Sequence, residues 1–562
     1  MKFRTLFLLL GLPLVLTAQT TLTVPAGHFG VDTARQLLLV HRDLAALNAA
    51  GSLPEQIDLA GTVYELSLST DSLHYGTHYP LTRSGAPAGT VTFTGLPLIN
   101  IRAAEPFSRD ERRPATFSLV DGEQFASSPL GIRYRGHQSL SYPKKNLDLE
   151  FYEDTTGQET VDFRFGGFRE DDDWVMDALA NEPLRVNSYV AHQLWLDIHE
   201  LYYAADEPKA NAGARVMYTE VFVNDDYRGV YMLMEQVDRK QLKLKKLKDG
   251  EVRGELYKGD DHTRATRFLE TRPLSTRRDD NWAGWEVDYP DIEDADAFPR
   301  LFDLIEFVAN SSDEDFRAGI AARFHLDNVI DYYLYANTIF AIDNHGKNQR
   351  LARYSTDEPY FFSVWDLDAT FGNNYDGSDM DDFSGWLGHN LYDRLIATNA
   401  ADFNTSVCDR YRDLAPGLLS ADSLGRRIDR ALATLADNGA LAREAARWPD
   451  LTDAGPEQRA YTADFLRQRT DWMNRHVCSR RVSTTDPGRG PAFRVHPNPT
   501  GGAVSVEREV TTRAPYRLFS ATGRLVATGW LASQTETIDL PRLTPGVYLL
   551  IVDRRAERLI IR

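Results

Sequence analysis

The sequence holds little cysteine, no excess of positive charge and a single long apolar run. Cysteine occurs at only two of the 562 positions, Cys408 and Cys478, which is too few for a structural zinc site. In an exported protein these two could form one disulfide; the alternative is a pair of buried thiols, and the sequence favours neither. The net charge of −19 argues against nonspecific binding to nucleic acid or to anionic membranes, because both require a basic face.

The one long apolar run lies at the N-terminus, in MKFRTLFLLLGLPLVLTAQT. Lys2 and Arg4 precede its apolar core and the small residue Ala18 follows, an order typical of a signal peptide, here residues 1–18. The core is too short to cross a bilayer, and no later stretch reaches about 18 apolar residues. We therefore expect a protein that is exported through the inner membrane and has no transmembrane segment.

The rest of the chain divides into regions of different pattern, and its length indicates several domains. Residues 19–95 hold short alternating segments broken by Gly, Pro and Ser, which predicts a small β-rich region. Residues 96–480 mix strand and helix patterns, which indicates an α+β domain. A linker at 481–492 separates a last module, 493–562, whose short strands and turn residues predict a small antiparallel β-sandwich.

The segment from Leu326 to Gly372 carries the groups from which a phosphotransfer site could be built. LDNVIDYYLYANTIFAI has helical spacing, with Asp327 as the expected N-cap. DNHGKN follows and provides Asp343 and Asn348. The run YFFSVW then predicts a strand, and it ends in the acids Asp366 and Asp368. In protein kinases an Asp orients the attacking hydroxyl, while an Asn five residues on and a second Asp hold magnesium on the phosphates.

The turn RGHQSLSYPKK, which begins at Arg135, lies between two predicted strands. Backbone N–H groups from Gly136 to Ser139 could cradle phosphates, and Lys144 or Lys145 could pair with them. Lys145 is preferred because it shares a strand face with the apolar residues of NLDLEF. The alternative is a solvent-exposed hairpin with a basic tip.

Two further acids are candidates for the same site. A helix is predicted to begin near Pro183, and Glu182 at its start could pair with the phosphate-binding lysine. A hairpin around Asn224-Asp225-Asp226 has a second strand that ends at Glu235, where a kinase would hold the adenine. The alternative for Glu235 is an ordinary acid on an edge strand.

An acidic loop follows the central segment. NNYDGSDMDDFSG concentrates carboxylates that could bind calcium through oxygen ligands. It completes no EF-hand pattern, so a flexible loop similar to a kinase activation segment is favoured. The acids concerned are Asp376, Asp379, Asp381 and Asp382.

Three separated segments, YRGHQSLSYPKKNLDLEF, VFVNDDYRGVYMLMEQVD and SVWDLDATFG, resemble the CotH family of secreted, atypical protein kinases related to spore-coat proteins. The resemblance runs from about Leu96 to about Val477. It implies a two-lobed, kinase-like α+β fold that uses ATP with Mg²⁺ or Mn²⁺. It places the catalytic role on Asp343, metal binding on Asn348, Asp366 and Asp368, and nucleotide binding on Arg135, Gly136, Ser139, Lys144, Lys145 and Glu235.

The last module has a resemblance of its own. HPNPTGG together with LTPGVYLLIV is similar to the type A sorting domain of the type IX secretion system. This implies that the secretion machinery is a partner, and that the mature protein is released or attached to the cell surface. The alternative is a carbohydrate-binding or spacer β-domain.

The leading hypothesis is an exported kinase that transfers the γ-phosphoryl group of ATP to Ser or Thr of a secreted or surface protein. The alternative is a non-catalytic structural or adhesion protein on a kinase-like fold, because a fold does not secure a function. A metal-dependent hydrolase that uses the acidic loop is less favoured, since the histidine ligands common in such sites are absent from the loop.

Overall fold

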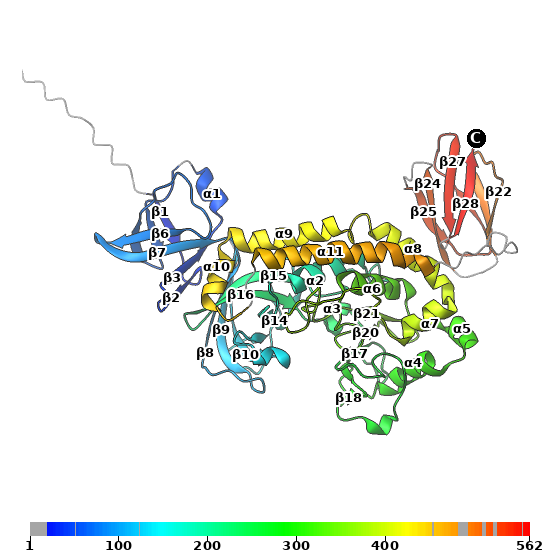
Figure 1. The fold of residues 1–562 in the computed structure, drawn as a ribbon, viewed down its shortest axis with the longest axis horizontal. Helices are drawn as coiled ribbons and strands as arrows, with labels where there is room; N and C mark the ends of the chain where they lie inside the picture. Colours follow the sequence, from blue (N-terminus) through cyan, green and yellow to red (C-terminus); the bar gives the residue numbers. More distant parts are fainter. Residues whose placement is uncertain are drawn as a thin grey trace, which may run out of the picture. The chain divides into compact units, whose positions relative to one another are not determined.

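The computed structural model describes residues 20–50, 52–122, 124–451, 455–480, 493–508, 513–520, 525–552 and 555–562. The predicted signal peptide and the predicted linker lie outside the described residues. The chain forms two compact units, Met1–Arg481 and Val482–Arg562, each with its own hydrophobic core (Figure 1). Among the described residues, no helix has the length and apolar character needed to cross a membrane.

A seven-stranded sheet forms the N-terminal part of the first unit. Alternating apolar residues of its strands, such as Leu22 and Val24, point into one core. The tripeptide at His41–Asp43 resembles a kinase catalytic loop only in sequence, because Asp43 caps the short helix α1 (Leu44–Ala49). In the order β1-β4-β5-β6-β7-β3-β2, the strands are β1 (Thr21–Val24), β4 (Gln56–Leu59), β5 (Thr62–Leu66), β6 (His78–Arg83), β7 (Ala86–Thr94), β3 (Leu37–His41) and β2 (Phe29–Asp32).

Seven strands then close into a barrel that carries the predicted phosphate-binding turn. Leu147 and Leu149 alternate into its core, as the pattern of NLDLEF predicts. The hairpin turn falls at Asn224 and Asp225, both with positive φ, as expected for a two-residue loop. The barrel order is β10 (Gln124–Arg135), β11 (Asn146–Phe151), β14 (Asp173–Asp177), β16 (Asp226–Glu235), β15 (Val216–Val223), β8 (Leu98–Ala103) and β9 (Arg113–Asp121), with β12 (Phe163–Arg164) and β13 (Glu170–Asp171) as a separate pair.

Helices and a five-stranded sheet make up the rest of the first unit. Helix α6 (Leu326–Ile339) is buried on all sides from Asn328 onwards, and α9 and α11 run side by side (Figure 1). The sheet order is β18 (Asn281–Trp282), β19 (Trp285–Tyr289), β17 (Glu255–Gly259), β20 (Arg350–Arg353) and β21 (Tyr360–Ser363). The other helices are α2 (Asn187–Ile198), α3 (Arg239–Leu242), α4 (Phe298–Asn310), α5 (Asp313–Arg323), α7 (Asn390–Thr398), α8 (Phe403–Leu414), α9 (Ala421–Asp437), α10 (Ala440–Arg447) and α11 (Pro456–His476), with short 3-10 turns η1 (Gln138–Ser141), η2 (Leu274–Thr276), η3 (Ala400–Asp402) and η4 (Val477–Arg480).

Two predicted helix starts are wrong. The N-cap of α6 is His325, whose side chain accepts a hydrogen bond from the Asn328 amide, so Asp327 lies inside the first turn. Helix α2 begins at Asn187 rather than near Pro183, because a tight turn intervenes and the Glu182 carboxylate accepts hydrogen bonds from the first amides of the helix.

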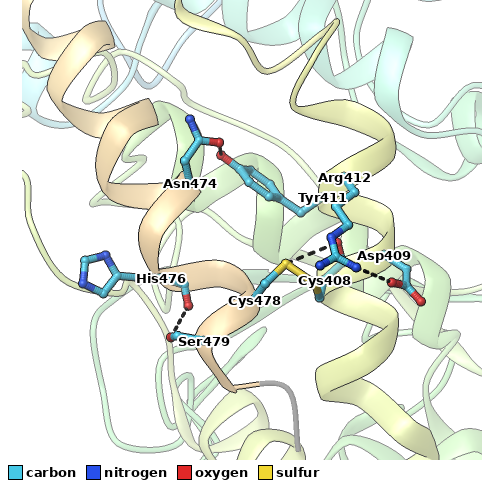
Figure 2. The surroundings of a disulfide bond; sticks show 8 residues. All are labelled: Cys408, Asp409, Tyr411, Arg412, Asn474, His476, Cys478 and Ser479. Carbon is cyan, nitrogen blue, oxygen red and sulfur yellow. Dashed lines mark hydrogen bonds and ion pairs between the residues drawn. A yellow bond between two sulfur atoms is a disulfide. The ribbon is translucent and has the colours of Figure 1, made fainter. Parts of the chain in front are cut away.

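The two cysteines form a disulfide. Cys408 of α8 is bonded to Cys478 of η4, which ties the last helical turn of the first unit to the helical core (Figure 2). Of the two states that the sequence left open, the disulfide is therefore the one present.

The second unit packs two antiparallel sheets around one core. Val504 and Val506 from one sheet meet Leu518 and Leu550 from the other. Together with the first unit it gives the predicted α+β class, whereas the two-lobed kinase arrangement stays a prediction. The sheets are β22 (Phe493–His496), β23 (Ala503–Arg508) and β26 (Thr535–Asp539), and β25 (Leu525–Leu531), β24 (Ala514–Ser520), β27 (Gly546–Val552) and β28 (Arg555–Ile561).

Candidate phosphotransfer site

The loop after α6 brings Asp343 and Asn348 together. Asn348 Nδ2 donates a hydrogen bond of 3.0 Å to Asp343 Oδ2. Asn348 is buried and has a φ of +58°, a conformation that costs a non-glycine residue free energy and is concentrated at functional sites. The predicted acid and amide thus form a direct pair on a constrained loop.

The end of strand β17 is joined to this loop by backbone hydrogen bonds. The Asn348 amide donates to Gly259 O at 2.8 Å, and the Gly259 amide donates to Gln349 O at 2.9 Å. A Cβ added at Gly259 would lie 1.9 Å from Gly346 O, so only glycine permits this approach. The position of Asn348 therefore depends on a residue about 90 positions earlier in the chain.

Asp343 is held ionised by a hydrogen bond from a histidine and by the charge of a lysine. Its Oδ1 lies 2.8 Å from His262 Nε2, and its Oδ2 lies 3.6 Å from Lys347 Nζ. Burial acts to raise the pKa of Asp343, but the hydrogen bond from His262 and the charge of Lys347 outweigh it and lower that pKa. A carboxylate with a low pKa is better suited to orient a hydroxyl group than to remove its proton early.

Asp366 lies just beyond strand β21 and faces other acids. Its side chain is open to solvent on one side but surrounded by protein on the others. This partial desolvation, and then the charges of Asp177 and Asp343, raise the pKa of Asp366 to about 6. Its φ of +54° is again a costly conformation for a non-glycine residue. The chain thus holds mutually repelling carboxylates together.

Asp368 is engaged within the protein. Its Oδ2 accepts a hydrogen bond of 2.5 Å from Asn181, and its Oδ1 accepts one of 2.7 Å from the Ala369 amide. Burial and then the charge of Asp366 raise its pKa well above the ordinary value. These contacts make Asp368 the cap of the turn that follows Asp366.

Sequence reasoning missed Asp177, the last residue of β14. Burial raises the pKa of its carboxyl, and its charge acts on Asp366, Lys144 and Arg135. The sequence marks Asp177 only as the acid that ends the strand DWVMD. His262, which follows Asp260 and Asp261 in the chain, was also missed.

Two arginines lie beside these acids. The guanidinium carbons of Arg135 and Arg350 are 5.3 Å and 5.2 Å from the ring centroid of Trp365, the residue before Asp366. Burial lowers the pKa of Arg135, while the charges of Asp148 and Asp366 act against that effect. Arg135 was predicted at the nucleotide site, and Arg350 and Trp365 were not.

The predicted phosphate turn is tight and supports itself. Gly136 has a φ of +99°, and a Cβ there would lie 1.9 Å from Ser139 Oγ, which donates to Arg135 O at 3.2 Å. Lys145 Nζ donates to Leu140 O at 2.8 Å and to Tyr142 O at 2.5 Å. Lys145 thus closes its own loop and remains partly accessible.

Lys144 is buried and its ammonium group is paired within the protein. Its ammonium is fully buried, lies 2.6 Å from Glu444 Oε1 of α10 and donates to Val230 O. Burial lowers its pKa to about 8, and the charge of Glu444 acts against that effect. The acid expected opposite a phosphate-binding lysine, Glu182, is wrong for Lys144, since Glu182 caps α2 and Glu444 is the partner.

Glu235 is also saturated by internal hydrogen bonds. Its Oε1 accepts from the Arg169 amide at 2.8 Å, and its Oε2 accepts from the Arg215 amide and Gln241 Nε2 at 3.0 and 2.9 Å. It lies within the closed barrel, so the edge-strand alternative is wrong. Its contacts hold three chain segments together.

The acidic loop uses its carboxylates locally. Asp379 Oδ1 accepts from Asn373 and Gln458, while Asp376 and Asp382 accept from serines two residues on. Within the described ranges, the one group of three His, Cys, Asp or Glu residues gathered closely enough for a metal is Asp162, Asp171 and Asp172, and Lys240 is paired with all three. Calcium binding by the acidic loop stays a prediction.

The residue types around Asp366 are those of a divalent-cation site, but Asp177, Asp343 and Asp366 are not among the described residues whose ligand atoms are gathered closely enough to hold one. Carboxylate and amide oxygens are the ligands that Mg²⁺ and Mn²⁺ prefer. Burial, and after it the charges of Asp177 and Asp343, raise the pKa of Asp366, and a bound cation would offset both effects. Asn348 adds an amide oxygen beside them, since its Nδ2 is directed to Asp343.

Comparison with known proteins gives the following matches. A family model described as CotH kinase protein matches residues 132–473, and one described as secretion system C-terminal sorting domain matches residues 494–562. The inner spore coat protein H of Bacillus subtilis (strain 168) is 25% identical over 254 residues, which are 45% of this chain and 61% of that protein. The matched stretch is thus less than two thirds of that relative's length.

Proposed function

The chain belongs to the CotH kinase protein family, and from this premise we propose that it is an exported protein kinase. It would transfer the γ-phosphoryl group of ATP to a serine or threonine of a secreted or surface protein. The observation that carries the proposal is the hydrogen-bonded pair of Asp343 and Asn348 beside Asp366, because these are the three groups that a kinase needs at its phosphates.

In the proposed reaction, the hydroxyl oxygen of the acceptor attacks the γ-phosphorus, and the bond from that phosphorus to the β–γ bridging oxygen breaks. Asp343 accepts a hydrogen bond from the hydroxyl group and receives its proton as ADP leaves. His262 and Asn348 fix the orientation of the Asp343 carboxylate. A fixed orientation lowers the entropic part of the activation barrier.

Asn348 and Asp366 would hold Mg²⁺ or Mn²⁺, with Asp177 adding negative charge nearby and Asp368 as the further candidate ligand. When bound, the ion neutralises charge on the transferring phosphoryl group. Arg135 adds positive charge next to Asp366, and Arg350, which is ion-paired with Asp288, also interacts with the charge of Asp366. Of the remaining nucleotide candidates, the Gly136–Ser139 turn and Lys145 are the ones accessible to a phosphate.

The C-terminal module supports a location outside the cell. Its match to a sorting domain implies handling by the type IX secretion machinery, followed by release or surface attachment. The Cys408–Cys478 disulfide agrees with an oxidising compartment. An acceptor protein would therefore also be secreted or surface-bound.

One observation favours the non-catalytic alternative. Lys144 and Glu235, two residues expected to touch the nucleotide, are both occupied by internal contacts. A kinase-like fold that serves as a structural or adhesion protein would retain such contacts and bind no nucleotide.

Transfer of labelled phosphate from ATP tests the proposal. We expect Mn²⁺- or Mg²⁺-dependent labelling of the protein or of a casein-type acceptor. Asp343→Asn and Asp366→Asn should each abolish it, whereas Asp303→Asn, an exposed acid on α4, should retain it. Labelling that persists in either site variant would contradict the assignment, and no labelling together with no metal-dependent ATP binding would support the adhesion protein.

A further inference from the structure

A positively charged groove lies between α2 and α9, apart from the acid cluster of Asp177, Asp343 and Asp366. Its volume is about 440 Å³. Helix α9 contributes most of the polar wall, and α2 closes the other side. The residues that matter are Gln193, Asp197, Ser423, Arg426, Arg427 and Arg430.

The charge of this groove is only partly neutralised. Arg427 Nη2 lies 2.6 Å from Asp197 Oδ2, the one acid in the wall. Arg426 and Arg430 are exposed, and neither forms an ion pair with a residue that the structure describes. Two positive charges therefore remain in a chain whose net charge is −19, so the groove is a local exception on an acidic protein.

The spacing of these side chains matches an extended acidic peptide. Ser423, Arg426, Arg427 and Arg430 follow an i, i+3, i+4, i+7 pattern and share one helix face. Arg426 and Arg430 are four residues apart, about 6 Å along the axis. Alternate residues of an extended chain are separated by about 6.6 Å. Guanidinium groups bind carboxylate and phosphate oxygens in a bidentate manner.

Helix α2 connects the groove to the acid cluster. Asn187 at its first turn donates to Thr370 O at 2.9 Å, in the turn that follows Asp366 and Asp368. Gln193 in the groove wall is six residues further along, about 9 Å up the helix. A peptide in the groove could therefore belong to the same protein whose hydroxyl lies at Asp343.

We propose that the groove formed by Arg426, Arg427 and Arg430 is a docking site for an acidic segment of the acceptor protein. The segment carries Glu, Asp or phosphorylated residues at alternate positions, and Gln193 and Ser423 supply neutral hydrogen-bonding groups beside it. This inference rests on the proposed function only in taking the docked protein to be the acceptor; docking itself needs neither nucleotide nor metal.

Fluorescence anisotropy with a labelled Glu-Ser-Glu-Ser-Glu-Ser-Glu peptide tests the site, with the Gln-for-Glu peptide as its uncharged control. We expect the Glu peptide to bind the full-length protein in EDTA. Arg426→Gln with Arg430→Gln should weaken binding about tenfold, the loss of two exposed ion pairs. Arg164→Gln, which removes an exposed arginine on β12, should leave binding unchanged.

Several outcomes separate the possibilities. Equal binding of the Glu and Gln peptides, or equal losses in the double variant and in Arg164→Gln, would overturn the proposal. The Glu peptide with phosphoserine in place of each serine is a third probe. Tighter binding than that of the Glu peptide would show that phosphate adds to the affinity, and no gain would show that the carboxylates suffice; both support the groove. Binding retained in Asp366→Asn shows that docking holds even where phosphate transfer fails.

Discussion

Asp343 and Asp366 carry the same chemical group in different electrostatic surroundings. His262 and Lys347 keep the Asp343 carboxyl ionised against the effect of burial, whereas burial and neighbouring acids raise the pKa of Asp366 to about 6. Carboxyl groups whose environments separate their pKa values have different roles in many active sites. In the proposed function, Asp343 orients a hydroxyl group and Asp366 binds a divalent cation.

The raised pKa of Asp366 predicts a pH-dependent cost in the metal-free protein. Its unfolded pKa is about 3.9. Because the native state binds the proton more tightly, the carboxyl destabilises the fold increasingly as pH rises from about 4 through 6. The full shift corresponds to about 3 kcal/mol, but solvent screening at this open side chain reduces the expected effect to about 1 kcal/mol.

Denaturation in EDTA measures this cost. Asp366→Asn should be more stable than the wild type by about 1 kcal/mol at pH 7.5 and equal to it near pH 4. Mn²⁺ should stabilise the wild type at pH 7.5 and leave the variant unchanged. A stability difference that is the same at both pH values would contradict the raised pKa of Asp366.

His262 should affect catalysis through Asp343. The substitution His262→Gln weakens the hydrogen bond that orients the Asp343 carboxylate, so we expect kcat to fall by about 10- to 100-fold. The KM for ATP should change little, because His262 contacts Asp343 and the Lys347 amide rather than the phosphate-side residues. His74→Gln, at an exposed histidine of the N-terminal region, is the matched control; a rise in KM with unchanged kcat would contradict the role.

The sequence reveals some of these residues and conceals others for a physical reason. Asp343 and Asn348 are close in the chain, and their place between a helix and a strand that ends in Asp indicates that both belong to the site, although the spacing does not predict the hydrogen bond between them. Asp177 and His262 reach the site through strand pairing and loop packing, which no local pattern encodes. Lys144 has the expected residue type in the expected turn, but its role depends on Glu444, 300 residues away.

At the scale of elements, the Lys144–Glu444 pair joins the barrel to α10. Lys144→Met leaves the buried Glu444 carboxylate with Arg185, whose Nε lies 3.3 Å from Glu444 Oε1, as its ion-pair partner. The expected loss is therefore at the lower end of the range for a broken buried pair, about 3 kcal/mol. Lys145→Met removes only hydrogen bonds to backbone carbonyls of its own loop, so the expected loss is about 1 kcal/mol. Urea denaturation compares the two variants, and a fully stable Lys144→Met protein that fails to bind ATP would instead make Lys144 the phosphate clamp.

The disulfide restrains a long segment of the helical part. It closes a loop of 70 residues between α8 and η4. The chain-entropy estimate for a loop of this length is about 4 kcal/mol. Cys408→Ser with Cys478→Ser should lower the free energy of unfolding by that order under oxidising conditions, and a reducing agent should remove the difference between variant and wild type. Equal stability without reductant would contradict this contribution.

The helices and strands that the sequence predicts are those whose pattern lies within one contiguous segment. Apolar spacing predicts the body of α6, although its N-cap is His325 rather than Asp327, and the alternation of NLDLEF predicts β11. The start of α2 was misplaced because Pro183 suggests a first turn, while the Glu182 side chain caps the helix four residues later. The parallel pairing of β8 with β15, which helps to close the barrel, joins segments more than 110 residues apart and has no sequence signal.

At the scale of the whole molecule, the N-terminal sheet and the C-terminal module differ in their attachment. Asp32 accepts a hydrogen bond of 3.0 Å from the Tyr227 amide of the barrel, and Asn438 after α9 accepts one of 2.5 Å from the Gly95 amide. The sheet is thus part of the unit that carries the site. The C-terminal module has a separate core, which suits a sorting domain that acts independently of catalysis.

Calorimetric titration of ATP in the presence and absence of Mn²⁺ tests the central claim most directly. The claim is that one site divides metal binding and hydroxyl orientation between Asp366 and Asp343. We predict metal-dependent ATP binding by the wild type and by Asp343→Asn, and its loss in Asp366→Asn. Binding that is independent of Mn²⁺, or lost equally in both variants, would contradict this division of roles.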